Sequence, residues 1–288
     1  MQHVRVWRDR GLQVEDEAEA VHYLTYIGYY RLSGYSRPLM RHGTGEAHKF
    51  KEGARFTNIL DLYRFDRELR LIMMDAIERI EVAFRTVFSN TMACKYGSHC
   101  YLEKKLFLFP DNAEWLARKI MDETGHAPEQ KRKRDVFFDH YYQKYSSPRL
   151  PPTWMVAEAL SINVWSRNYE HLASHGDRKE IARQLGCRVP LLESWMHAIC
   201  YLRNLCAHHL RVWNREFTIK PMIPKKQHTE DMQRNDRFYA SAFAINVLME
   251  KACPRTGWWE RLMALIDSKP FVNKAATGFP DTRQKEEN

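Results

Sequence analysis

The chain has 288 residues, of which 44% are hydrophobic and 12% aromatic, so it can bury a substantial core and is not a disordered polypeptide. Its 45 lysines and arginines exceed its 36 aspartates and glutamates, and the formal charge of +9 favours association with polyanions such as RNA. No segment approaches the roughly 20 apolar residues that span a bilayer, which predicts a soluble cytoplasmic protein without a membrane partner. The six cysteines include no Cys-x-x-Cys pair and indicate free thiols.

Apolar residues recur at three- and four-residue spacing, which predicts an all-α fold. A first helix is expected over residues 15–30, followed by a loop over 36–53. The clearest pattern then runs through 57–93 without glycine or proline and predicts one helix of about 35 residues, the spine of a helical bundle. Its apolar stripe contains Leu62, Phe65, Leu69, Ile72, Met73, Ile77, Ile80, Phe84 and Val87.

The rest of the chain is also expected to be helical. Residues 110–152 read as a basic insertion, with helices at 113–122 and up to about 145 and the run KRKR between them. Further helices are predicted at 154–172, 177–186, 191–212, 237–252 and 257–268. Together these elements predict a single helical domain over 1–268 and a flexible tail over 269–288.

The helix predicted over 191–212 carries the segment RNLCAHH, which has the parts for acid–base chemistry on a phosphate. Arg203 has a permanently charged, planar guanidinium group whose several N–H donors can stabilise a pentacoordinate phosphoryl group. His208 can accept or donate a proton near neutral pH, and Asn204, one turn before it, shares its face. Arg203 lies about 140° away from His208 around the helix, so the cluster suits a groove between two helices. The spacing alone also fits an ordinary hydrogen-bonded histidine.

Four segments, in this order, resemble the Abi-like family of abortive-infection phage-resistance proteins (AbiD/AbiF type) within the HEPN superfamily: GYYRLSGY, LYRFDRELRLIMMDAIERIEVAFRT, PPTWMVAEALS and LRNLCAHHLRVWN. The resemblance covers about residues 10–217. It implies an HEPN-like helical bundle and a ribonuclease motif of an arginine, a polar residue, three variable positions and a histidine. Here these are Arg203, Asn204, Leu205-Cys206-Ala207 and His208.

The resemblance further implies a metal-independent endoribonuclease with no cofactor. It would act in phage defence or a toxin–antitoxin system and leave 2′,3′-cyclic phosphate and 5′-hydroxyl ends. The expected partners are the RNA substrate, a second copy that completes a composite active site, and a small-RNA or protein antitoxin. A non-catalytic RNA-binding module and a helical dimerisation adaptor are the alternatives.

Further site residues are predicted around the motif. His209 is a second candidate for the acid–base role. Glu81 could orient Arg203 or His208, although Glu78, Glu81 and Arg85 could equally form a charge network on a solvated helix face.

Candidate RNA-binding residues lie in three parts of the chain. Arg85 of the spine helix is the first candidate. Arg31 and Tyr35 combine charge with an aromatic ring, as in single-strand RNA sites, with core packing as the alternative for the tyrosines. The basic run Lys131, Arg132, Lys133 and Arg134 would add salt-dependent RNA affinity, or would simply be a solvated surface.

Overall fold

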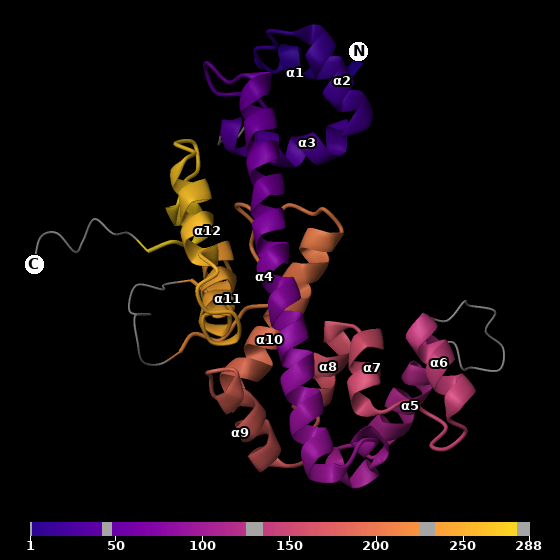
Figure 1. The fold of residues 1–288 in the computed structure, drawn as a ribbon. Coiled ribbons are helices and arrows are strands. Elements are labelled where there is room, and N and C mark those ends of the chain that lie inside the picture. Colours follow the sequence, from indigo (N-terminus) through magenta and orange to yellow (C-terminus); the bar gives the residue numbers. More distant parts are fainter. Residues whose placement is uncertain (1, 42–47, 125–134, 225–233, 281–288) are drawn as a thin grey trace, which may run out of the picture. The chain divides into compact units, whose positions relative to one another are not determined.

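The computed structural model describes residues 2–41, 48–124, 135–224 and 234–280 (Figure 1). Over these ranges the regular secondary structure consists of twelve α-helices and four short 3-10 helices, with three isolated β-bridges and no strand. The predicted all-α class is therefore confirmed. The helices form two compact units: unit 1 contains residues 1–71 and 209–213, and unit 2 contains 72–208 and 214–288.

Unit 1 is built from three short α-helices, one 3-10 helix and the beginning of a long α-helix. Its helices are α1 (Gln2–Asp9), α2 (Glu17–Tyr26), α3 (Tyr29–Ser36), η1 (Arg37–Leu39) and the first part of α4 (Phe56–Tyr96). The single helix predicted over 15–30 is wrong: Gly28 has φ 90°, a left-handed conformation that ends α2 and lets α3 start in a new direction. Asp16 caps α2 by accepting a hydrogen bond from the Glu19 N–H at 2.9 Å.

Unit 2 contains the remainder of α4 and the other helices of the described chain. They are η2 (Cys100–Leu102), η3 (Lys104–Leu106), α5 (Asp111–Glu123), α6 (Val136–Lys144), α7 (Thr153–Ala159), α8 (Ile162–Glu170), α9 (His175–Gln184), α10 (Val189–Ala207), α11 (Phe238–Ala252), α12 (Trp258–Asp267) and η4 (Ala275–Thr277). The spine helix is confirmed, and α4 is even longer than expected, at 41 residues.

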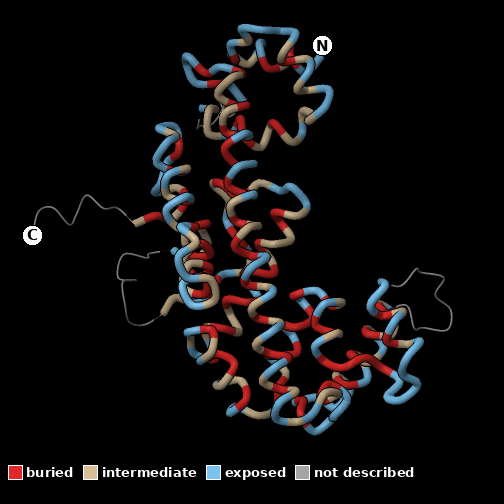
Figure 2. Tube along the Cα trace, in the orientation of Figure 1, coloured by how far each residue is buried: buried red, intermediate tan, exposed pale blue. Residues whose placement is uncertain are grey.

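The core of unit 2 surrounds α10, which packs against α8, α9 and α11. Buried positions recur along this helix in Figure 2, and they include every residue of its predicted apolar side. These residues are Leu192, Trp195, Met196, Ile199 and Leu202. The helical period in the sequence thus identified the buried face of α10 correctly.

Two predicted helices of unit 2 end earlier than the sequence pattern suggested. The helix expected over 154–172 is broken into α7 and α8, because Leu160 is extended (ψ 140°) and its carbonyl accepts a hydrogen bond from Arg85 Nη1 at 3.3 Å. The helix expected over 191–212 ends at Ala207, where His208 is the C-terminal cap. His209 then turns the chain with φ 57°.

The basic run predicted at residues 131–134 lies outside the described residues. Within the segment expected to be a tail, Val272 and Phe279 are buried, and the Phe279 ring lies 4.8 Å from that of Tyr239. Among the described helices, none combines the length and the apolar character that a membrane span requires.

Candidate functional site

The predicted motif occupies the last turn of α10. The His208 N–H donates to the Asn204 carbonyl at 3.0 Å, so the backbone hydrogen bonding of the helix continues up to the histidine. Asn204 Oδ1 lies 3.5 Å from Arg203 Nη1. Arg203 and Asn204 are half-buried and His208 is exposed, which leaves the imidazole accessible to a ligand and holds the guanidinium closer to the protein.

Glu81 and Arg85 project from α4 into unit 2 rather than onto a solvated face. Their side chains are only 16% and 14% exposed, and Glu81 Oε1 lies 3.8 Å from Arg85 Nη1. Glu78, in contrast, is exposed. The Arg85 Nε is buried without a hydrogen-bond partner among the described atoms. The charge network on a solvated face therefore does not describe this pair.

Cys200 is a buried residue of α10 whose thiol pKa is influenced by the charges of both Glu81 and the motif arginine. Burial raises the pKa of the Cys200 thiol to about 12, a rise opposed by a hydrogen bond with Ser166 and by the charge of Arg203, and assisted by the charge of Glu81. The two charges therefore act on the pKa of this thiol in opposite directions. The thiol stays protonated at neutral pH and behaves as a small core residue, and it is free, as the sequence indicated.

The chain that follows the motif belongs to unit 1, where polar side chains hold its backbone. Arg31 Nη1 donates to the His209 carbonyl, and Arg70 Nη1 donates to the Leu210 carbonyl at 3.4 Å. The backbone N–H groups of Val212 and Trp213 donate to Asp66 Oδ1 at 3.0 and 2.7 Å. The segment 209–213 is therefore anchored, and the Arg31 guanidinium, predicted to bind RNA, is used in part to bind protein backbone.

Tyr35 belongs to the same network and is buried, with 1% of its surface exposed. Its hydroxyl donates to Asp66 Oδ2 at 2.6 Å, and burial together with the neighbouring Asp66 raises the Tyr35 pKa. A buried ring cannot stack on a nucleotide base, so core packing, the alternative that the sequence left open, describes Tyr35.

Asp66 and Arg70 were missed as important residues. Neither residue belongs to the predicted apolar stripe of the spine helix, yet the exposure of Arg70 is 5% and that of Asp66 is 0%, and the two form a buried ion pair one turn apart. Burial raises the pKa of Asp66, while Arg70, Tyr35 and the two backbone N–H groups oppose that rise. One sequence signal could have identified this ion pair: Asp66 and Arg70 are an acid and a base four positions apart, and they directly follow Phe65 and Leu69 of the apolar stripe.

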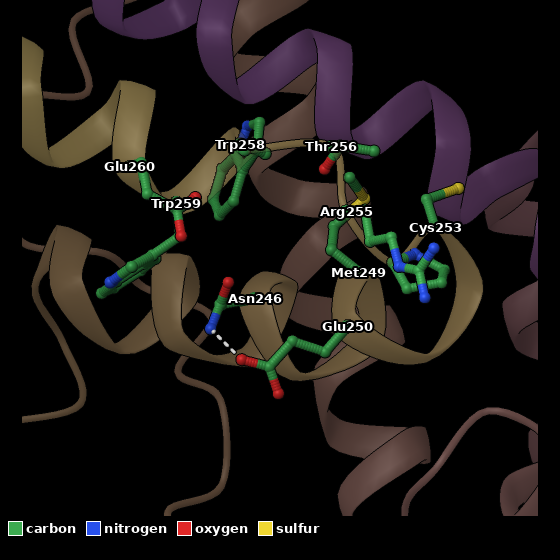
Figure 3. Close-up of a pocket in the computed structure, with 11 residues that line it drawn as sticks. Asn246, Met249, Glu250, Cys253, Arg255, Thr256, Trp258, Trp259 and Glu260 are labelled. Carbon is green, nitrogen blue, oxygen red and sulfur yellow. Dashed lines mark hydrogen bonds between the residues drawn. The ribbon is translucent and has the colours of Figure 1, made fainter.

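Unit 2 also has a pocket of about 220 Å³ where the chain turns from α11 to α12 (Figure 3). Trp258, Trp259 and Arg255 line it together with two carboxylates, Glu250 and Glu260. Asn246 Nδ2 donates to Glu250 at 2.9 Å. The acidic groups outnumber the single arginine, so the pocket does not favour a polyanion, and it contains none of the motif residues.

The predicted site residues therefore fall into two groups. Unit 2 holds Arg203, Asn204, His208, Glu81 and Arg85, while unit 1 holds His209, Arg31 and Tyr35. Within the described residues, no group of three or more histidine, cysteine, aspartate and glutamate side chains is arranged to hold a metal ion.

A protein-family model described as Abi-like protein matches residues 22–214, which is more than half of the chain. The match includes the motif, Glu81 and the anchored segment 209–213, and it ends before α11, α12 and their pocket. Searches of curated proteins and of solved structures found no match.

Proposed function

This chain belongs to the Abi-like protein family, which acts in abortive-infection defence, and on that premise we propose that it is a metal-independent HEPN endoribonuclease. The observation that carries the proposal is the last turn of α10, where an exposed imidazole follows a half-buried arginine and asparagine. These are the groups that RNA cleavage by the 2′-hydroxyl needs: a proton acceptor, a phosphate ligand and a polar orienting group.

The chemistry follows from the three side chains. His208 removes the proton from the 2′-hydroxyl, whose oxygen forms a bond to the adjacent phosphorus as the bond from phosphorus to the 5′-oxygen breaks. Arg203 stabilises the extra negative charge of the pentacoordinate phosphoryl group, and Asn204 orients the hydroxyl. The products are a 2′,3′-cyclic phosphate and a 5′-hydroxyl.

The leaving 5′-oxygen needs a proton from a second acid. His208 of a second copy of the chain supplies it if two motifs meet in a homodimer, and His209 is the candidate within one chain. A composite site of this kind makes activity depend on two chains, and therefore on protein concentration.

Glu81 and Arg85 support the motif in this proposal. The Glu81 side chain is only 16% exposed, and its contact with Arg85 is long at 3.8 Å. We propose that its carboxylate orients Arg203, whose charge acts on the same Cys200 thiol. Arg85 remains a proposed RNA contact only through the 14% of its side chain that is exposed, because its Nε is buried and its Nη1 donates to the Leu160 carbonyl. The basic run at 131–134 remains a proposed contact for the RNA backbone.

The experiment compares purified wild type with Arg203→Ala and His208→Ala on labelled RNA. We expect each substitution to lower the cleavage rate by about 10²- to 10⁴-fold. The exposed Arg183 and His175 provide matched controls, and Arg183→Ala and His175→Ala should cleave like the wild type. Cleavage should persist in chelator and give cyclic phosphate ends.

Four outcomes contradict the proposal in different ways. Equal activity of all variants means that the motif is not catalytic, and loss of cleavage in chelator means that the reaction needs a metal. If the wild type binds RNA without cutting it, the chain is an RNA-binding module. If it only dimerises, the chain is an adaptor.

A further inference from the structure

The exposed side of α10 continues beyond the motif. Residues 197, 201, 204 and 208 are spaced four, three and four positions apart, so they fall within about 60° around the helix. His197 is exposed and Tyr201 is half-buried, whereas positions 198–200 and 202 between and beside them are buried. His197 and Tyr201 therefore extend the surface of Asn204 and His208 by two turns towards the N-terminus of α10.

The segment 214–224 of unit 2 borders this surface. Near the end of α10, the Phe217 ring packs edge-on against Tyr201, with ring centroids 6.0 Å apart and an interplanar angle of 76°. Nearer the beginning of α10, the Met222 N–H donates to Ser194 Oγ at 2.8 Å, and Trp195 Nε1 donates to the Met222 carbonyl at 2.9 Å. The segment thus runs back along the helix, and its Phe217 contacts the Tyr201 ring.

The charges around this surface suit a polyanion. The nearby carboxylate of Glu193 pairs with Arg178 at 2.9 Å, and that of Glu216 pairs with Arg237 at 2.7 Å. Both acids are therefore neutralised by arginines. The bordering segment adds the exposed Lys220, which increases the attraction of this side of the unit for phosphate groups.

We propose that the α10 surface formed by His197, Tyr201, Asn204 and His208 is a track for single-stranded RNA that leads into the cleavage site. Tyr201 stacks on the base of a nucleotide next to the scissile phosphate, and His197 contacts the strand one step further. Along the helix axis Tyr201 lies about 4.5 Å from Asn204 and His197 about 6 Å further, on the scale of one to two nucleotide steps. A base paired in a duplex cannot lie on the ring, so the track selects unpaired RNA.

This inference rests on the proposed ribonuclease function, and its test separates the two. Tyr201→Leu keeps an apolar contact for Phe217 and removes the stacking ring, whereas Tyr201→Phe keeps the ring. In the full-length chain we expect Tyr201→Leu to raise KM for an unpaired oligonucleotide by about 10- to 100-fold with little change in kcat. Tyr201→Phe should stay within about twofold of the wild type.

The same substitutions are placed in a His208→Ala background, and binding to the unpaired oligonucleotide and to its duplex is measured by fluorescence anisotropy. His197→Ala should weaken binding of the unpaired strand, and the exposed His175→Ala is the matched control. Preference for the unpaired strand should fall in the Tyr201→Leu variant.

The outcomes are distinguishable. If the wild type cleaves RNA and Tyr201→Leu has an unchanged KM, the track is wrong and the ribonuclease stands. If the wild type does not cleave but Tyr201→Leu abolishes RNA binding, the ribonuclease is wrong and the track stands. If Tyr201→Leu alters the mass of the protein in solution and not its RNA affinity, the surface joins two copies of the chain and the track is refuted.

Discussion

Asp66 is expected to be the most sensitive single residue of unit 1. Its carboxylate is fully buried and receives four groups of donors: the Tyr35 hydroxyl, the Arg70 guanidinium and the backbone N–H groups of Val212 and Trp213. The substitution Asp66→Ala removes all of these acceptor interactions and leaves a buried guanidinium beside an empty space. Such a change destabilises a protein more than the loss of an exposed ion pair does.

The size of the effect follows from those partners. Breaking a buried ion pair by removing one member costs about 3–5 kcal/mol, because the remaining charge loses the buried opposite charge that offsets its desolvation. The two backbone N–H groups lose their acceptor as well, and each costs about 1–3 kcal/mol if water cannot replace it. Asp66→Asn keeps one oxygen for the two backbone N–H groups, but it loses the charge and the second oxygen, which accepts from Tyr35 and Arg70. Because the N–H groups keep their acceptor, we expect a smaller loss, of about 2–3 kcal/mol.

Amide hydrogen exchange measures this effect at the place where it arises. In the Asp66→Ala variant, the amides of Val212 and Trp213 should exchange at least about 100-fold faster, since about 3 kcal/mol corresponds to that ratio. Asp61 lies on the same helix and pairs with Arg64 at 3.6 Å, with both side chains close to half exposed, so Asp61→Ala is the matched control and should change exchange little. Unchanged protection of residues 212 and 213 in Asp66→Ala would refute the assignment of Asp66 as their anchor.

Three further predictions concern unit 2. Glu81→Gln should lower the rate of RNA cleavage by about 10- to 100-fold, because Arg203 would be misplaced. Glu78 is an exposed neighbour on the same helix, so Glu78→Gln should leave the rate unchanged. Equal cleavage rates for the two variants would exclude an orienting role of Glu81. Burial acts to raise the pKa of Asp177, but hydrogen bonds from Lys95 and Tyr96 outweigh it and hold the pKa below its usual range. The stabilisation is therefore present above about pH 4 and lost as the pH falls through the depressed pKa, so urea titrations should show the advantage of wild type over Asp177→Asn shrinking below pH 4 and constant above it. Gly186 has φ 76°, and a Cβ there would meet Lys251 at 3.2 Å, so Gly186→Ala should cost about 1 kcal/mol or more, and a neutral result in thermal unfolding would contradict the left-handed turn.

The sequence predicted elements well where the apolar period alone decides the structure. The long α4 and the buried side of α10 are of this kind, since both depend on side chains at three- and four-residue spacing. The sequence pattern did not predict the helix ends that coincide with hydrogen bonds from residues far away in the chain. The break at Leu160 coincides with a hydrogen bond from Arg85, and the turn after Ala207 precedes a backbone that Asp66 binds, two interactions between residues far apart in the chain.

The candidate site was predictable only in part for a related reason. The chemistry of Arg203, Asn204 and His208 can be read from residue types, but a half-buried Glu81 and an exposed Glu78 look alike in a sequence, and their difference comes from the elements packed around α4. For Tyr35, the residue type suggested a role in binding that its burial excludes. Aromatic and basic residues in one short segment suggested RNA binding, whereas burial assigns the tyrosine to a hydrogen bond with Asp66.

The anchored segment brings together residues from three of the four family-like segments of the sequence. Tyr35 and Arg31 come from GYYRLSGY, Asp66 and Arg70 from LYRFDRELR, and Val212 and Trp213 from LRVWN, and in unit 1 all three segments meet around one buried carboxylate. None of these residues supplies the proposed acid–base chemistry, which lies in the last turn of α10. A sequence that kept only Arg203 and His208 would retain the reacting groups and lose the contacts that fix the chain directly after them. Chains that combine the Arg-to-His spacing with an acid and a base at the positions of Asp66 and Arg70 are therefore better candidates for this site than chains that share the spacing alone.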